Sequence, residues 1–401
     1  MPANRWVLVT SAIVTMLLSS ANAGEGCRWD DVFSDNAPDN VVRAMAVHDD
    51  GRGPALYAGG GFSQVGGQAM SRIARWDGTA WETLGDGVNA DVEALAVWDD
   101  GTGPALYVGG RFTEAGGEPA NRIARWDGST WTALDSGLDG DVLALAAYDD
   151  GTRSRLYVGG RFTVADGQPA TFLAAWDGTG WSPVGGGTNG FVFALQAADN
   201  GFDPVTEDTD HRLWVGGLFQ QAGETAVSNI AEWDGDRDRW FGLSTGTDDI
   251  VRAITQRTEG DDEVQYIGGD FNQANVIAFH IAKYALTQFI EPGDGTLGDV
   301  NALSVFDDGT GPGVYAAGEF QSASGTSANR IARWDGTAWS ALDAGLSGDV
   351  LALAPFGSGS ERSLYAGGWF LFANGQPSPR IARWLCADPL IFSDSFEAPQ
   401  D

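Results

Sequence analysis

The sequence predicts an all-β protein, a seven-bladed β-propeller of four-stranded antiparallel blades. The first observation is a repeat: an apolar run that ends in two glycines and an aromatic residue, as in residues 106–112, occurs seven times, with Ala317 in place of the first glycine in one copy. The second is its period, since successive copies start 49 to 57 residues apart. Regular copies at this spacing indicate a repeat architecture, in which each unit buries its faces against its neighbours.

The third observation is that each repeat contains four short apolar runs, which are typical of strands and too short for independent helices. In residues 141–190 these runs are 142–148, 156–160, 172–176 and 181–184. An Asp-Asp-Gly turn signal follows the first run, and an Asp-Gly hairpin signal follows the third. The glycine pair indicates close backbone approach or positive φ. Large aromatic residues at fixed offsets, such as Trp126 and Trp131, are expected to pack between blades.

The chain begins with features of a secretory signal peptide, predicted over residues 1–23. Arg5 supplies a positive charge, an apolar stretch follows, and Ala21-Asn22-Ala23 resembles a cleavage site. The apolar stretch is shorter than a membrane span requires. We therefore expect cleavage near Ala23, no membrane insertion, and export to the periplasm, the cell surface or the medium. The propeller is assigned to residues 24–386 and a C-terminal tail to residues 387–401.

Two cysteines, Cys27 and Cys386, lie near the two ends of the mature chain. The last repeat has a third run without a fourth, and the segment around Cys27-Arg28-Trp29 has the pattern of the missing fourth strand. Aligned on residues 121–134, the cysteines fall at consecutive positions of the hairpin turn. We therefore expect the N-terminal strand to complete the last blade and a Cys27–Cys386 disulfide to replace the peptide link.

The chain is strongly acidic, with a net charge of −32 and a pI near 4.1. This charge argues against nucleic acid or an anionic membrane surface as a partner. Removal of 23 residues leaves 378, or 54 per blade, so no second domain is expected. We expect a monomer.

The order of motifs resembles the kelch-type propeller repeat. The motifs are Val108-Gly109-Gly110-Arg111-Phe112, then Ile123-Ala124-Arg125-Trp126-Asp127-Gly128, then Trp131 with Leu134. They are more similar still to the repeats of exported bacterial delta-60-type propellers and of fungal cortical polarity-marker proteins. The resemblance implies a propeller fold and an exported or surface protein without assigned catalysis. It also implies that the loops joining strands four to one and strands two to three share the ligand-binding face.

Four aspartates directly precede the first strand of their blades and are the candidate site residues: Asp91, Asp141, Asp299 and Asp349. If the strand starts ring the channel mouth, these carboxylates could hold Ca²⁺, which prefers several oxygen ligands. The alternative is turn chemistry, in which Asp side chains accept hydrogen bonds from nearby backbone N–H groups. No other cofactor is predicted.

Other repeated polar residues are interpreted structurally. The Asp-Asp-Gly loops are expected to be hairpins on the opposite face, and the repeated arginine pairs, such as Arg122 and Arg125, are expected to pair with Asp between blades. The chain has three histidines at unrelated repeat positions and no metal-ligand spacing. We therefore expect no catalytic residues and predict an exported binding protein for a carbohydrate or a protein. The alternative is a polysaccharide hydrolase or lyase with carboxylates at the channel mouth.

Overall fold

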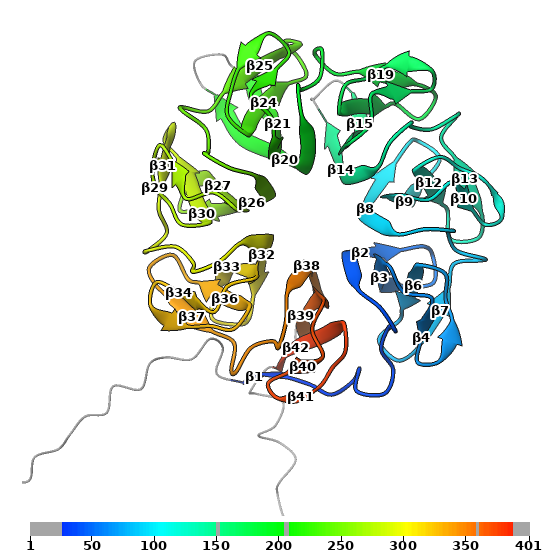
Figure 1. The fold of residues 1–401 in the computed structure, drawn as a ribbon, viewed down its shortest axis with the longest axis vertical. Coiled ribbons are helices and arrows are strands. Elements are labelled where there is room, and N and C mark those ends of the chain that lie inside the picture. Colours follow the sequence, from blue (N-terminus) through cyan, green and yellow to red (C-terminus); the bar gives the residue numbers. More distant parts are fainter. Residues whose placement is uncertain (1–25, 150–152, 204–207, 358–360, 388–401) are drawn as a thin grey trace, which may run out of the picture.

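Seven four-stranded antiparallel sheets stand in a ring around a central channel, which confirms the predicted fold class (Figure 1). The computed structural model describes residues 26–149, 153–203, 208–357 and 361–387. The predicted signal peptide and all but the first residue of the predicted tail lie outside these ranges. No helix in the described ranges is long and apolar enough to cross a membrane.

Each blade runs from an inner first strand to an outer fourth strand. The first strands are β2 (Val42–Asp49), β8 (Val92–Asp99), β14 (Val142–Asp149), β20 (Phe191–Asp203), β26 (Val251–Glu259), β32 (Val300–Asp307) and β38 (Val350–Phe356). The second strands are β3 (Pro54–Gly60), β9 (Pro104–Gly110), β15 (Ser154–Gly160), β21 (Asp208–Leu218), β27 (Asp262–Gly269), β33 (Pro312–Gly318) and β39 (Glu361–Gly368).

The outer half of each blade is shorter. The third strands are β6 (Ile73–Trp76), β12 (Ile123–Trp126), β18 (Leu173–Trp176), β24 (Ile230–Asp234), β30 (Ile281–Ala285), β36 (Ile331–Trp334) and β42 (Ile381–Ala387). The fourth strands are β7 (Trp81–Thr83), β13 (Trp131–Ala133), β19 (Trp181–Pro183), β25 (Arg239–Gly242), β31 (Gln288–Ile290), β37 (Trp339–Ala341) and, from the N-terminus, β1 (Cys27–Trp29).

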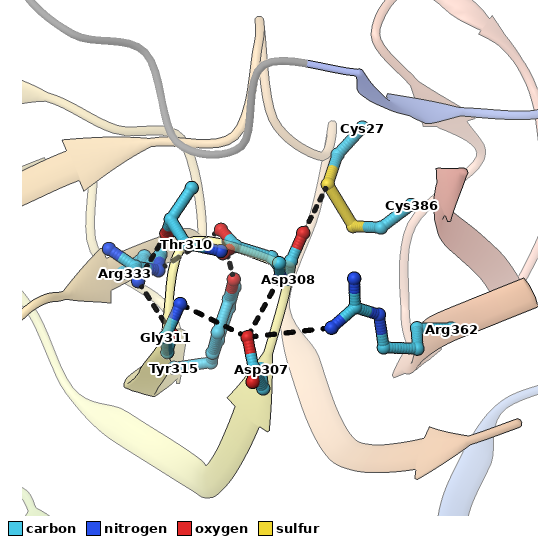
Figure 2. The surroundings of a disulfide bond; sticks show 10 residues. Cys27, Asp307, Asp308, Thr310, Gly311, Tyr315, Arg333, Arg362 and Cys386 are labelled. Carbon is cyan, nitrogen blue, oxygen red and sulfur yellow. Dashed lines mark hydrogen bonds and ion pairs between the residues drawn. A yellow bond between two sulfur atoms is a disulfide. The ribbon is translucent and has the colours of Figure 1, made fainter. Parts of the chain in front are cut away.

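The N-terminal strand β1 closes the ring by pairing with β42, as predicted. The register places Cys27 opposite Cys386 and Trp29 opposite Trp384, and the two cysteines form a disulfide. Where other blades turn through an Asp-Gly hairpin, the two strands here continue side by side. Figure 2 shows the disulfide against blade six, with the Cys27 sulfur 3.6 Å from the Asp308 carbonyl oxygen.

The glycine pair allows close approach between backbones, at negative φ. A Cβ at Gly110 would lie 2.1 Å from the carbonyl oxygen of Asp91, because a β-bulge brings the start of β8 against the end of β9. A Cβ at Gly109 would lie 2.3 Å from a methyl group of Val142 in the next blade. Blade six carries Ala317 at the position of Gly109, so a methyl group can be accommodated there.

The hydrophobic core is divided into seven clusters, each between two neighbouring blades. Six fourth-strand tryptophans also donate their indole N–H to a backbone carbonyl of the preceding blade at 2.7–3.1 Å. Trp131, for example, donates to the Leu84 carbonyl. Blade five has Phe289 at this position. Most of the stability must therefore come from contacts between blades, as expected of a repeat architecture.

Candidate functional site

The loops between strands four and one and those between strands two and three lie together on one face, which we call the loop face. The loop between strands two and three of each blade folds into a hairpin of two very short strands, which the sequence did not predict. These hairpins are β4–β5 (Gln64–Val65, Gln68–Ala69), β10–β11 (Glu114–Ala115, Glu118–Pro119), β16–β17 (Val164–Ala165, Gln168–Pro169), β22–β23 (Gln221–Ala222, Thr225–Ala226), β28–β29 (Gln273–Ala274, Val276–Ile277), β34–β35 (Ser322–Ala323, Thr326–Ser327) and β40–β41 (Phe372–Ala373, Gln376–Pro377).

A side chain in the preceding loop holds each hairpin in most blades. Asp139 accepts hydrogen bonds from the backbone N–H groups of Thr163 and Val164, and Asp39, Asn89, Asn189, Asp248 and Ser347 make equivalent contacts in their blades. Blade six has Leu297 here, with 72% of its surface exposed. The alternative role of the four candidate aspartates was to accept hydrogen bonds from backbone N–H groups of a turn. Other residues thus make hydrogen bonds of this kind.

The four candidate aspartates lie at the channel mouth, and each lies close to a basic side chain of the preceding blade, an arginine in three cases and a histidine in one. The pairs are Arg43–Asp91 at 3.8 Å, Arg111–Asp141 at 3.5 Å, His280–Asp299 at 3.2 Å and Arg330–Asp349 at 3.2 Å. These contacts join neighbouring blades at the rim of the channel.

Carboxylates at the mouth also perturb one another. Burial raises the pKa of Asp299, and the nearby Asp270 raises it further, while His280 and Arg252 oppose this effect. Burial likewise raises the pKa of Glu93 against the effect of Arg43 and Arg111. Among the described residues, no group of three or more His, Cys, Asp and Glu is arranged to hold a metal ion. The calcium site therefore stays a prediction.

Below the mouth the channel is lined mostly by apolar side chains. A cavity of about 220 Å³ is lined by the inner strands, with Met45, Leu95, Leu145 and Ile254 among its residues. Arg252 is the one charged residue of this lining, and it is paired with Asp270. An ionic or strongly polar ligand would therefore be held at the rim, where charged groups are available.

A groove crosses the loop face over blades six and seven. It consists of two adjoining hollows of about 530 and 370 Å³ that share Gln321 and Arg330. Leu297 and Glu319 line the first hollow, and Phe372 lines the second. We call this feature the blade 6–7 groove.

Arg330 is held in place at the centre of the groove. Its guanidinium donates a hydrogen bond to the Glu319 carbonyl and pairs with Asp349. Burial raises the pKa of the Glu319 carboxyl, and Asp349 and Asp299 raise it further. The groove therefore combines a fixed cation, a carboxyl group with a raised pKa and neutral hydrogen-bonding groups.

Next to the groove, blade seven exposes three large apolar side chains: Trp369, Leu371 and Phe372, with exposed fractions of 44%, 48% and 44%. We call them the blade 7 patch. The guanidinium groups of Arg380 and Arg43 lie 5.2 Å and 5.9 Å from the centre of the Trp369 ring. Such an exposed aromatic surface beside polar groups is unusual on a soluble protein unless it binds something.

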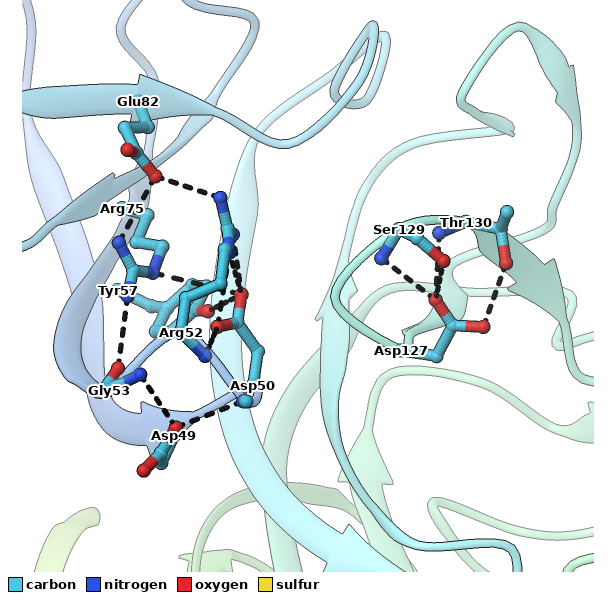
Figure 3. Close-up of polar contacts among 11 residues, drawn as sticks. Asp49, Asp50, Arg52, Gly53, Tyr57, Arg75, Glu82, Asp127, Ser129 and Thr130 are labelled. Carbon is cyan, nitrogen blue, oxygen red and sulfur yellow. Dashed lines mark hydrogen bonds and ion pairs between the residues drawn. The ribbon is translucent and has the colours of Figure 1, made fainter.

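The opposite face carries structural polar networks. Asp49 and Asp50 order the first hairpin, and Tyr57, Arg52 and Arg75 surround the Asp50 carboxylate (Figure 3). Although burial favours its protonated form, hydrogen bonds from Arg52 and Tyr57 lower the pKa of Asp50 to about 2. The expected inter-blade pairing is wrong for Arg75 and, likewise, for Arg125 and Arg333, which pair within their own blades.

The turn after the third strand is also structural. Asp127 accepts hydrogen bonds from the backbone N–H groups of Ser129 and Thr130, as Figure 3 shows, and these bonds lower its pKa despite burial. Asp77, Asp177 and Asp335 do the same in their blades. These carboxylates are already engaged by the turns that they form, so they make poor ligand sites.

Comparison with protein-family models and with curated proteins finds no match to this chain. The architecture, a seven-bladed propeller of antiparallel sheets closed by its N-terminal strand, is established by the structure itself. The groove and the blade 7 patch were missed from the sequence. The signal for them was the apolar sequence Trp369-Phe370-Leu371-Phe372, because every other repeat carries a polar residue directly after the central Phe.

Proposed function

We propose that the protein is an exported, non-catalytic binding protein that holds a carbohydrate on its loop face. The observation that carries this proposal is the blade 6–7 groove beside the blade 7 patch. Its two hollows, of about 530 and 370 Å³, are of the size that small-molecule ligands occupy. Its lining offers an aromatic ring at Phe372 and hydrogen-bonding groups at Gln321 and Arg330.

These groups suit a sugar for a physical reason. A pyranose has an apolar C–H face, which packs on aromatic rings, and a rim of hydroxyl groups, which need donors and acceptors. The proposal also includes three expectations from the sequence. The protein is a kelch-like or delta-60-type propeller, it is exported by its signal peptide, and it is a monomer. A protein partner on the same surface is the other form that it can take.

The test is a glycan and polysaccharide binding screen of the disulfide-intact protein, run with calcium and with a chelator. Arg330→Ala and Phe372→Ala should abolish or strongly weaken any binding. Arg122→Ala is the matched control, because Arg122 bonds the Arg111 carbonyl in blade two as Arg330 bonds that of Glu319. Loss of binding on chelation would support the aspartate ring as a calcium site.

The absence of glycan binding, or binding that both groove variants retain, would refute the groove as a carbohydrate site. In that event, a partner captured from the producing cells by the wild-type protein and lost from Phe372→Ala would support the protein-binding form.

A hydrolase or lyase is the second candidate, favoured by the raised pKa of Glu319 next to Asp349. A pair of neighbouring carboxyl groups, one of which has a raised pKa, is the arrangement used in glycosidic bond cleavage. Release of reducing ends from a bound polysaccharide, lost in Glu319→Gln with binding retained, would identify an enzyme. Bound polysaccharide recovered intact would leave the non-catalytic function.

A further inference from the structure

The boundary between blades three and four departs from the pattern at the channel mouth. Three phenylalanines occupy positions that are charged in blade two: Phe172 stands where Arg122 does, Phe191 where Asp91 does, and Phe193 where Glu93 does. The ion pair that joins blades one to two, two to three, five to six and six to seven is thus replaced by an aromatic cluster here.

The three rings are in contact. The ring centres of Phe172 and Phe191 are 5.5 Å apart, and those of Phe191 and Phe193 are 6.4 Å apart. Phe191 remains 37% exposed. Phe172 has a φ of 61°, a left-handed conformation that is rare for a bulky residue. The equivalent positions in the other blades share this backbone conformation but carry Arg, Asn or His.

Arg161 lies on this cluster. Its guanidinium carbon is 5.0 Å from the centre of the Phe191 ring and 5.6 Å from that of Phe193. A guanidinium that stacks with its flat face on a ring keeps its N–H edge free to bind an anion. An exposed, pre-oriented guanidinium edge recognises a carboxylate through two parallel hydrogen bonds.

Arg161 also differs from Arg111, its equivalent in blade two, in the carboxylates that surround it. Arg111 occupies the same repeat position in blade two and pairs with Glu93 at 3.0 Å and Asp141 at 3.5 Å. Within the described ranges, Arg161 has no carboxylate partner, although the chain carries a net charge of −32. Replacement of the partner aspartate by Phe191 leaves this arginine as a local positive site in an acidic protein.

We propose that Arg161, with Phe191 and Phe193, binds the carboxylate of an acidic saccharide, so that the ligand of the loop face contains uronic acid residues. This inference rests on the proposed carbohydrate-binding function and names the class of sugar. The exposed Phe191 ring would pack against the C–H face of the sugar while Arg161 holds its carboxylate. A chain of Asp or Glu residues offers carboxylates without the C–H face of a sugar ring.

The position of the cluster relative to the groove fits a chain-like ligand. The cluster lies at the start of β20 and beside the end of β15, and the blade 6–7 groove lies around the β34–β35 hairpin and β40, on the other side of the central opening (Figure 1). A polysaccharide that crosses the mouth could therefore contact both sites. A single uronic acid residue would contact only one of them and should bind more weakly.

The experiment measures binding of oligogalacturonate and oligomannuronate by calorimetry, with their carboxyl-reduced, neutral counterparts as ligand controls. Arg161→Gln should weaken binding of the acidic oligomers by about tenfold or more, since hydrogen bonds to charged groups are the strong ones. Arg111→Gln is the matched control and should change binding little. Thermal melting of each variant checks folding.

A second variant tests the charge argument without removing the arginine. Phe191→Asp restores the aspartate of the repeat and should pair with Arg161, so it should weaken acidic oligomers as much as Arg161→Gln does. Equal binding of acidic and reduced oligomers, or equal effects of the Arg161 and Arg111 variants, would overturn the inference but leave the proposed function. Displacement of the sugar by poly-glutamate at equal affinity would overturn the saccharide part. No binding of any saccharide would overturn both.

Discussion

The disulfide between Cys27 and Cys386 should account for a large part of the stability of the ring. It closes a loop of 359 positions, for which the chain-entropy relation gives about 6 kcal/mol. The strand that it anchors is short, since β1 has only three residues. Without the disulfide, β1 would be held by the contacts of its own residues, and the ring by these contacts and by the packing of blade seven against blade one.

The N-terminal segment makes few contacts with blades six and seven. Trp29 is buried between blades six and seven, its indole donates to the Leu342 carbonyl at 3.0 Å, and Asp30 pairs with Arg383. They should keep the ring closed in the folded state, so we expect the Cys27→Ser, Cys386→Ser double variant to fold. Its free energy of unfolding should fall by about 3–5 kcal/mol.

The assay is urea unfolding of the wild type and the double variant, followed by tryptophan fluorescence, together with amide hydrogen exchange. The variant should show a lower midpoint, and exchange should be fastest in β1 and β42. Reduction of the wild type should reproduce both effects. Unfolding midpoints of variant and wild type that agree closely would refute the reasoning, because the loop-closure contribution would then be negligible.

Three further changes test the contacts within and between blades. Trp131→Phe removes the N–H that binds the Leu84 carbonyl and should cost about 1 kcal/mol, measured by urea unfolding; no change would mean that water replaces the bond without loss. Gly110→Ala should cost more than about 2 kcal/mol and Gly109→Ala less, because the first change clashes with backbone and the second with a side chain; the reverse order in thermal melts would contradict this. Asp50→Asn should remove about 2 kcal/mol at neutral pH. Because the pKa of Asp50 is lowered to about 2, this stability is present above pH 4 and lost as the pH falls toward 2, so unfolding curves of variant and wild type should converge there.

The fold was predictable because each repeat carries its own local signals. Glycine pairs and Asp-Gly turns mark strand ends, and their recurrence fixes the number of blades. The closure was predictable because a missing fourth strand at one end matched an extra one at the other. Both inferences compare residues with their own repeat, so they need no knowledge of distances across the ring.

The site was harder to predict, because its members come from different blades. The position of Asp349 was inferred from the repeat, but its partner Arg330 belongs to the preceding blade and reaches it only through the geometry of the ring. The same holds for Arg161 and Phe191. That Leu297 replaces a polar residue of the repeat could be seen in the sequence. Its effect on the groove could not, because it depends on a hairpin to which the Leu297 side chain gives no hydrogen bond.

The pairing of β1 with β42 also sets an order of events during synthesis. The chain emerges from the ribosome with its N-terminus first, so the segment that completes the last blade is made before every blade. Cys27 must remain unpaired until Cys386 has been synthesised 359 positions later. Six blades can assemble in sequence, but the seventh needs both ends of the chain. Truncation at either end would therefore leave the same blade incomplete.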